Sequence, residues 1–231
     1  MEVSGKNVII TGVSKGIGKA IVEALLEKGS NVAGWGRNKP ADIDSPNFHF
    51  IEVDIRDPRL VESAYSKTTD IMGDEVQVLI NNAGLGHFKI MEDQTVEEWQ
   101  EMFDTNVHGL FYCTKSVIPG MKAKRYGHII NISSVAGLMG LNEATGYCGT
   151  KFAVKGISEA MFRELRRFNI KVSCIYPGSV NTEFFDNYPG ITANDTMMKT
   201  EEIASTVIHV LENPDNFITM HVEVRPMNAS S

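Results

Sequence analysis

The chain has 231 residues, of which 42% are hydrophobic, and a formal net charge of -7. That length and apolar content suit one α/β domain with a single sizeable core. An acidic protein is repelled by the phosphates of nucleic acids and by anionic membrane surfaces, so we expect neither as a partner.

The first residues lack the features of an export or membrane-insertion segment. Glu2 precedes a strand-like run that starts at Asn7, which leaves no charged region followed by a long apolar stretch, and no apolar run is long enough to span a membrane. The three cysteines, Cys113, Cys148 and Cys174, form no CxxC pair, which argues against a disulfide framework and a metal cluster. We expect a cytoplasmic protein with reduced thiols and no catalytic metal.

Short apolar runs rich in β-branched residues alternate with helical patterns along the chain. The predicted strands are 7–11, 31–36, 48–53, 76–80, 128–133, 171–176 and 220–224. Helical periodicity covers 17–29, which ends at a glycine, and 95–124, where Thr95 and Glu98 form a capping-box start.

This alternation predicts an α/β fold: a single doubly wound Rossmann-type domain over 1–231, with a seven-stranded, mostly parallel sheet covered by helices on both faces. Two segments are irregular, 37–46 and 181–196. The second is long enough to form a lid over a substrate, at about 181–199.

A glycine-rich turn, 11-TGVSKGIG-18, follows the first predicted strand and leads into the first helix. Its glycines allow the backbone to approach a ligand closely, and the following helix directs its free N–H groups at an anion such as a pyrophosphate. The spacing of Gly12, Gly16 and Gly18 differs from the G-x-G-x-x-G fingerprint, and a glycine-rich turn can also be only a geometric necessity.

The second strand ends in 34-GWGRN-38, without the carboxylate that binds the ribose hydroxyls of NAD. Arg37 offers a planar guanidinium suited to a phosphate, and Lys15 adds a second positive charge. The sequence therefore favours NADP(H) over NAD(H). The alternative is that Arg37 and Lys15 are both ordinary solvated surface charges.

One helical turn separates a tyrosine from a lysine in 147-YCGTK-151. Taken alone, such a pair most often lies on a solvated helix edge. With its neighbours the chain resembles the short-chain dehydrogenase/reductase family over nearly its whole length. The motifs that carry the resemblance are 11-TGVSKGIG-18, Asp54, 81-NNAG-84, Asn106, 133-SS-134, 147-YCGTK-151 and 177-PGSVNT-182.

The resemblance implies a catalytic set and its roles. Tyr147 is the expected general acid and base, and its pKa is expected to be lowered by Lys151 together with the positive nicotinamide ring of the oxidised cofactor. Lys151 is also expected to bind a ribose. Of the two adjacent serines, the family pattern selects Ser134 for the substrate carbonyl, and Ser133 is expected to satisfy the backbone. Asn106 resembles the residue that positions a water linking Lys151 to solvent.

The resemblance also implies which residues line the cofactor site. They are Gly12, Ser14, Lys15, Gly16, Ile17, Gly18, Arg37, Asp54, Ile55, Asn82, Ala83, Gly84, Tyr147, Lys151, Pro177, Gly178, Val180 and Thr182.

The implied activity is hydride transfer from NADPH to the carbonyl of a small, largely apolar ketone or aldehyde, or the reverse oxidation of an alcohol. Val135, His87, Phe184 and Phe185 are candidate substrate contacts, although His87 suits an ordinary loop residue as well. Two alternatives stay open: a 3-oxoacyl-acyl-carrier-protein reductase, and a non-catalytic NADP(H)-binding regulatory or scaffold protein. The resemblance implies a homodimer or homotetramer, formed through the helices near 99–124 and 150–168.

Overall fold

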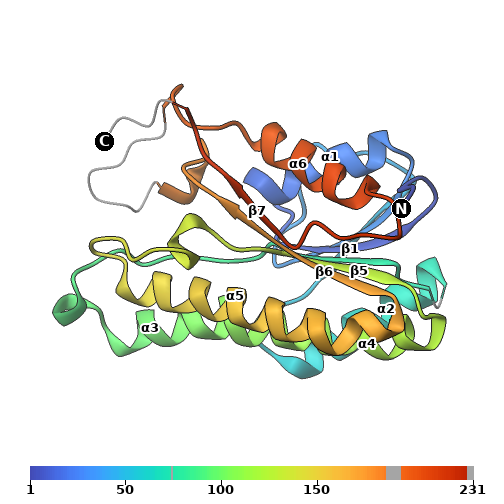
Figure 1. Ribbon diagram of the computed structural model, residues 1–231, viewed down its shortest axis with the longest axis horizontal. Helices are drawn as coiled ribbons and strands as arrows, with labels where there is room; N and C mark the ends of the chain where they lie inside the picture. Colours follow the sequence, from blue (N-terminus) through green and yellow to red (C-terminus); the bar gives the residue numbers. More distant parts are fainter. Residues whose placement is uncertain (74, 186–193, 228–231) are drawn as a thin grey trace.

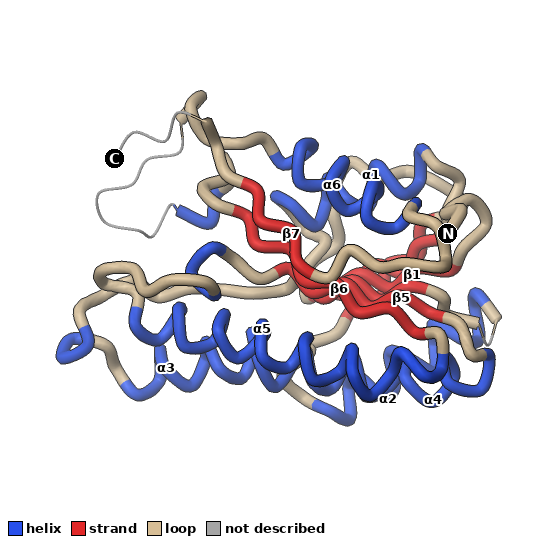
Figure 2. The backbone as a smooth tube through the Cα atoms, viewed as in Figure 1, coloured by secondary structure: helices blue, strands red, loops and turns tan. Residues whose placement is uncertain are grey.

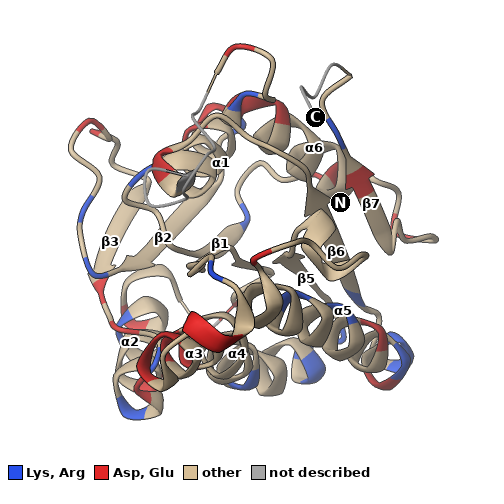
Figure 3. Cartoon of the chain, turned by 90° about the vertical axis from the view of Figure 1, so that its left-hand side faces the viewer, with Lys and Arg blue, Asp and Glu red and all other residues tan. Residues whose placement is uncertain are grey.

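The computed structural model describes residues 1–73, 75–185 and 194–227. Seven parallel strands form one sheet in the order β3-β2-β1-β4-β5-β6-β7, which confirms the predicted doubly wound fold and makes every strand pairing parallel. Figure 3 views the strands end-on, from β3 on one side to β7 on the other. The strands are β1 (Asn7–Thr11), β2 (Asn31–Gly36), β3 (Phe48–Glu52), β4 (Val78–Asn81), β5 (Gly127–Ile132), β6 (Ile170–Pro177) and β7 (His221–Val224).

The helices form a layer on each face of the sheet (Figures 1 and 2). They are α1 (Gly16–Glu27), α2 (Pro58–Met72), α3 (Val96–Phe103), α4 (Leu110–Lys124), α5 (Thr145–Leu165) and α6 (Thr200–Glu212). In Figure 1, α1 and α6 lie on one side of the sheet and the remaining helices lie on the other. Among the described residues, no helix has the length and apolar character needed to cross a membrane.

Both faces of the sheet are buried, and successive residues of each strand pack into different hydrophobic cores, one on each face. In β1, Val8 and Ile10 pack with the apolar sides of α1 and α6, whereas Ile9 packs toward α2 and α4. This arrangement explains why the strands are almost continuously apolar rather than alternating. The sheet positions every strand's carboxyl end at one edge, and the strand order reverses between β1 and β4, where doubly wound sheets bind ligands.

Helix starts follow the local signals in the sequence. Thr95 and Glu98 form the predicted capping box at the start of α3. Asp57 caps α2 by accepting a hydrogen bond of 2.8 Å from the backbone of Arg59, and Pro58 occupies the first helical position.

The predicted helix over 95–124 is not one continuous α-helix. A π-helical segment, η2 (Asp104–Gly109), separates α3 from α4. Single π-turns inside helices often occur at functional sites, and this one contains Asn106. The expected lid at 181–199 lies partly outside the described residues, because 186–193 are not described.

Candidate active site

A cavity of about 430 Å³ opens at the carboxyl edge of the sheet, between the loops that follow β1 to β6. All the residues predicted for cofactor binding line it, from Gly12 in the first loop to Thr182 after β6. Ser134, Tyr147 and Lys151 line the same cavity, together with Val135 and Phe184. The structure therefore brings together side chains from both halves of the chain.

The glycine-rich loop has the close backbone approach that its sequence suggests. Gly12 and Gly16 have positive φ angles of 73° and 60°, which side-chain-bearing residues rarely adopt. A Cβ at Gly18 would overlap the carbonyl oxygen of Gly12 and lie 2.5 Å from Asn82 Nδ2. Only a hydrogen atom fits at Gly12 and Gly18, so glycine lets the loop fold tightly against Asn82 and Ala83 at the start of α1. The free backbone N–H groups of that first helical turn suit an anion such as a pyrophosphate.

The loop after β4 braces this glycine loop. Asn82 Nδ2 donates hydrogen bonds of 3.0 Å to the carbonyl oxygens of Thr11 and Gly12. Thr11 Oγ1 accepts hydrogen bonds from the backbone N–H groups of Asn82 and Ala83, at 3.1 and 3.0 Å. The motif at 81–84 thus has a structural role in fixing the glycine loop.

Charged side chains gather at the ends of β2 and β3. Arg37 is exposed at the cavity wall, whereas Lys15 forms an ion pair with Glu183 from the loop after β6. Hydrogen bonds from Arg56 hold the pKa of Asp54 below its ordinary value, with a smaller contribution from the charge of Arg37. Sequence reasoning missed Arg56, whose guanidinium lies 2.6 Å from the Asp54 carboxylate.

Tyr147 and Lys151 lie one turn apart on α5, and both are buried rather than on a solvated helix edge. Lys151 Nζ lies 5.6 Å from the centroid of the Tyr147 ring and donates a hydrogen bond of 3.1 Å to the carbonyl oxygen of Ile132. The pair is fixed between α5 and the end of β5.

The lowering of the Tyr147 pKa by Lys151 and an oxidised nicotinamide stays a prediction, and the protein alone shifts that pKa in the opposite direction. Burial raises the pKa of Tyr147 to about 12, and hydrogen bonding to the Ser134 side chain opposes only part of that increase. Burial also lowers the pKa of Lys151 to about 8. Desolvation penalises both charged forms, so in this structure a neutral phenol lies beside a lysine whose charge is costly to keep.

The two adjacent serines divide as the sequence predicts. Ser133 is buried, and its hydroxyl donates a hydrogen bond of 3.2 Å to the carbonyl oxygen of Lys151. Ser134 faces the cavity and caps the short 3-10 helix η3 (Val135–Gly137), accepting a hydrogen bond of 3.1 Å from the backbone of Ala136. Both serines line the cavity, but the Ser133 hydroxyl is buried and donates to a backbone carbonyl, which leaves Ser134 as the serine more open to a ligand.

Asn106 does not line the cavity; its neighbour Thr105 does. Its Oδ1 accepts a hydrogen bond of 2.9 Å from the backbone N–H of Leu85, and its Nδ2 donates to the Leu85 carbonyl oxygen at 2.8 Å and to Thr150 Oγ1 at 3.0 Å. Asn106 thus ties the π-helical turn to the loop after β4 and to α5.

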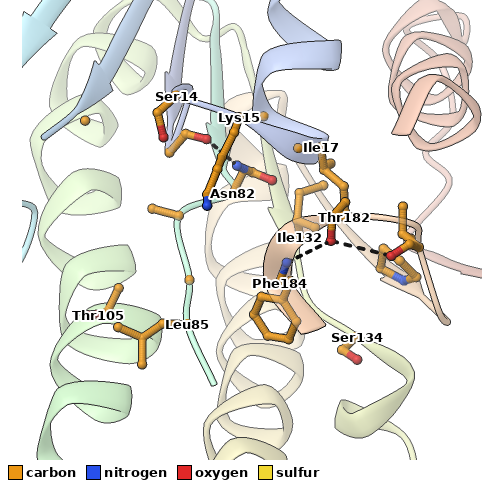
Figure 4. Close-up of a pocket in the computed structure, with 18 of the residues that line it drawn as sticks. Ser14, Lys15, Ile17, Asn82, Leu85, Thr105, Ile132, Ser134, Thr182 and Phe184 are labelled. Atoms are coloured by element: carbon orange, nitrogen blue, oxygen red, sulfur yellow. Dashed lines mark hydrogen bonds between the residues drawn. The ribbon is translucent and has the colours of Figure 1, made fainter. Parts of the chain in front are cut away.

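His87 does not line the cavity either. Its Nε2 lies 2.9 Å from a carboxylate oxygen of Glu101 on α3, so the ring is held away from the site. Phe184 lines the cavity from η5 (Glu183–Phe185), and Figure 4 shows its backbone N–H bonded to Thr182 Oγ1, at 3.3 Å. Phe185 ends this turn, and its side chain lies outside what the structure describes.

Comparison with known proteins gives a consistent result. The sequence matches the family model described as short chain dehydrogenase over residues 6–190. The 3-oxoacyl-acyl-carrier-protein reductase of Escherichia coli strain K12 is 32% identical over 232 residues, covering 95% of this chain and 95% of that protein. A serine dehydrogenase, solved in a closed form complexed with NADP+, superimposes with a TM-score of 0.88 at 27% identity, covering 97% of this chain and 96% of that chain.

A 3-ketoacyl-(acyl-carrier-protein) reductase from Brucella melitensis, solved with NADH, superimposes with a TM-score of 0.88, covering 96% of this chain and 97% of that chain. At 22% identity, this likeness establishes the shared fold. The cofactors in these two solved structures differ, so cofactor preference has to be argued from the residues of this chain.

Proposed function

The chain belongs to the short-chain dehydrogenase/reductase family, and from this premise we propose that it reduces a small carbonyl compound with NADPH, or oxidises the corresponding alcohol, in a single catalytic domain. The observation that carries the proposal is the convergence of Ser134, Tyr147 and Lys151 on the cavity that the glycine loop also lines. When bound, the nicotinamide supplies or accepts the hydride, which no side chain of the protein can do.

The residues around the cavity fit a dinucleotide. The glycine loop and the first turn of α1 would hold the pyrophosphate, because both line the cavity and the first turn of a helix has free backbone N–H groups. Arg37 would bind a 2′-phosphate with two parallel hydrogen bonds. Lys151 would hold a ribose hydroxyl, and its ammonium is already fixed in the cavity wall by Ile132. NADP(H) is therefore the cofactor that we propose.

At the reacting end, Ser134 and Tyr147 would both hydrogen-bond the substrate oxygen. The Tyr147 phenol donates its proton to that oxygen as negative charge develops there, and Ser134 stabilises the same charge. A phenol that stays protonated in its buried position is ready for reduction, the direction in which it acts as an acid. Lys151 would stabilise the phenolate that remains after the proton has left.

The proposal is tested by following NADPH oxidation with a panel of neutral ketones and aldehydes. Tyr147→Phe is expected to reduce turnover by a factor of roughly 10³ or more while leaving the Kd for NADPH within about threefold. Tyr112→Phe, on α4 and away from the cavity, is the matched control and should behave like the wild type. Unchanged turnover in Tyr147→Phe would overturn the catalytic assignment.

A second candidate is the reduction of 3-oxoacyl thioesters, which the similarity to the Escherichia coli 3-oxoacyl-acyl-carrier-protein reductase supports. It is distinguished by adding a 3-oxoacyl thioester to the same panel. If no member of the panel is reduced and NADPH still binds, the non-catalytic alternative is the better description.

We also propose that copies of the chain associate through α4 and α5, as a homodimer or homotetramer. Phe111 on α4 and Phe152 on α5 are large apolar side chains that are 51% and 44% exposed in the isolated chain. Light scattering during size-exclusion chromatography would measure the assembly, and a monomer at micromolar concentration would contradict this proposal.

The three buried, unpaired cysteines suit a reducing compartment and support a cytoplasmic location.

A further inference from the structure

The substrate end of the cavity contains three aromatic rings that contact one another. The rings of Phe88 and Tyr147 have centroids 5.2 Å apart, those of Tyr147 and Phe184 are 5.7 Å apart, and those of Phe88 and Phe184 are 5.8 Å apart. The two phenylalanine rings meet nearly edge-to-face, at 79°. We call Phe88, Tyr147 and Phe184 the aromatic corner.

The corner is assembled from three separate parts of the chain. Phe88 comes from the loop after β4, Tyr147 from α5 and Phe184 from η5. Gly86 makes room for this meeting, because a Cβ there would lie 2.8 Å from the Phe88 ring and 3.1 Å from the Phe184 ring. The backbone of Phe184 is also anchored to Thr182 Oγ1, at 3.3 Å. Phe88 and Phe184 are thereby held beside the phenol that we propose as the proton donor.

Among the described residues, the remaining wall beside the two phenylalanines is apolar, and the cation Lys151 lies on the Tyr147 side, bonded to the carbonyl oxygen of Ile132. Leu85, Val135 and Leu141 line it. Glu183, next to Phe184, is paired with Lys15, and Asp54 is paired with Arg56 near the other end. A carboxylate on the far side of the substrate's ring, away from the carbonyl, would lose hydration against these apolar side chains without gaining a partner among them.

We propose that the aromatic corner makes this enzyme selective for neutral carbonyl compounds in which a flat aromatic ring is attached to the carbonyl carbon. This inference rests on the proposed reductase function and specifies its substrate class. Aromatic rings attract a further ring edge-on or offset at centroid distances of about 4.5–7 Å, beyond the effect of buried area. Converted to rates, one such contact corresponds to a factor of roughly two to ten in kcat/KM.

The test uses two ketones with the same number of non-hydrogen atoms, acetophenone and cyclohexyl methyl ketone, so that flatness and aromaticity are the main differences. The wild type is expected to favour acetophenone by about tenfold in kcat/KM. In Phe88→Leu and Phe184→Leu that ratio is expected to fall by roughly two- to tenfold, because leucine keeps apolar bulk but lacks a ring. Phe217→Leu, at an exposed position after α6, is the control and should keep the wild-type ratio.

Charge is tested with benzaldehyde and 4-carboxybenzaldehyde, and we expect the neutral aldehyde to be favoured by at least about tenfold. Binding is measured separately, by titrating 1-phenylethanol and 1-cyclohexylethanol into the protein with NADP+ and determining both Kd values. Turnover of cyclohexyl methyl ketone as fast as acetophenone, or a ratio unchanged in both leucine variants, would overturn the aromatic selectivity.

The two proposals fail in different ways. If no carbonyl compound is reduced but 1-phenylethanol still binds about tenfold more tightly than 1-cyclohexylethanol, the reductase function is contradicted and the aromatic corner is supported. If ketones are reduced but the two alcohols bind equally, the reductase function stands and the corner does not select aromatic rings.

Discussion

Lys151 Nζ lies 5.6 Å from the centroid of the Tyr147 ring, and both side chains are less than a tenth exposed. An ammonium in such a place has lost most of its hydration and has one protein acceptor in its place, the carbonyl oxygen of Ile132 at 3.1 Å. Burial of this ammonium lowers the free energy of unfolding unless a bound ligand supplies further hydrogen-bond acceptors. Substitution of Lys151 can therefore test whether the protein gives up stability for function at this site.

Replacing Lys151 with methionine is expected to stabilise the cofactor-free protein at pH 7 by about 1–2 kcal/mol, while turnover falls at least about a hundredfold. The folded-state pKa of Lys151 is lowered to about 8, below the unfolded value of about 10.4. Below pH 8 both states are protonated, and the folded state carries the full cost of the buried charge. Between about pH 8 and 10.4 the unfolded chain binds more protons, so wild-type stability rises with pH.

The advantage of Lys151→Met should therefore shrink from pH 7 to pH 10. Urea unfolding of both proteins at the two pH values, without cofactor, measures it, and linear extrapolation gives the free energy of unfolding. A variant less stable than the wild type at pH 7, or an advantage that does not change with pH, would contradict the buried-charge argument.

Cofactor preference should depend more on Arg37 than on Lys15. Arg37→Ala is expected to raise the Kd for NADPH at least about tenfold and to leave the Kd for NADH within about twofold, because only NADPH carries the 2′-phosphate. Lys15→Ala should raise the Kd for NADPH only about two- to threefold, since Lys15 is already paired with Glu183.

Fluorescence titration with both dinucleotides measures these constants. Arg59→Ala is the control, because Arg59 is an exposed arginine paired with Asp57 and does not line the cavity. If Arg37→Ala weakens NADPH and NADH binding equally, the 2′-phosphate assignment is wrong.

Much of the fold was predictable because local patterns and tertiary structure agree in this chain. Strands buried on both faces must be apolar throughout, and the parallel sheet brings their carboxyl ends to one edge, so the motifs that follow them converge. The capping box at Thr95 depends on nearby residues only, and it forms as predicted. The glycines in 11–18 form a tight turn, but Gly12 and Gly18 also pack against Asn82, which is distant in the sequence.

What sequence patterns missed depends on contacts between distant residues. The π-helical turn contains no proline, and its side-chain anchors are Leu85 and Thr150, far from Asn106 in the sequence. The pairing of Lys15 with Glu183 links residues 168 positions apart. The raised pKa of Tyr147 follows from burial, and the extent of burial is known only once the chain has folded.

Gly18 packs closely against the loop that precedes α1. Alanine at this helical position is therefore expected to destabilise the protein, the opposite of its usual effect in a helix. Alanine normally stabilises a helix interior by about 1 kcal/mol relative to glycine. At Gly18 the added Cβ would overlap the Gly12 carbonyl oxygen, so Gly18→Ala is expected to destabilise the fold by about 2 kcal/mol or more and to abolish NADPH binding.

Gly140 provides the control, because a Cβ there would have no atom within 4 Å and its φ is not left-handed. Gly140→Ala should change the free energy of unfolding by less than about 0.5 kcal/mol. Thermal unfolding and NADPH titration of both variants measure the difference, and wild-type NADPH affinity in Gly18→Ala would contradict the proposed phosphate loop.

Asn106 supplies the final prediction, because its side chain satisfies both backbone groups of Leu85 and the hydroxyl of Thr150. Asn106→Ala would leave these partly buried groups without that partner, at a cost of about 2–3 kcal/mol. We expect faster amide hydrogen exchange at Leu85 and a fall in kcat/KM of at least about tenfold, since Leu85 lines the cavity. Asn31→Ala, which removes a single bond to Asn7 at 3.2 Å, is the control and should leave Leu85 protected. Unchanged exchange at Leu85 in Asn106→Ala would show that the π-helical turn holds this loop by other contacts.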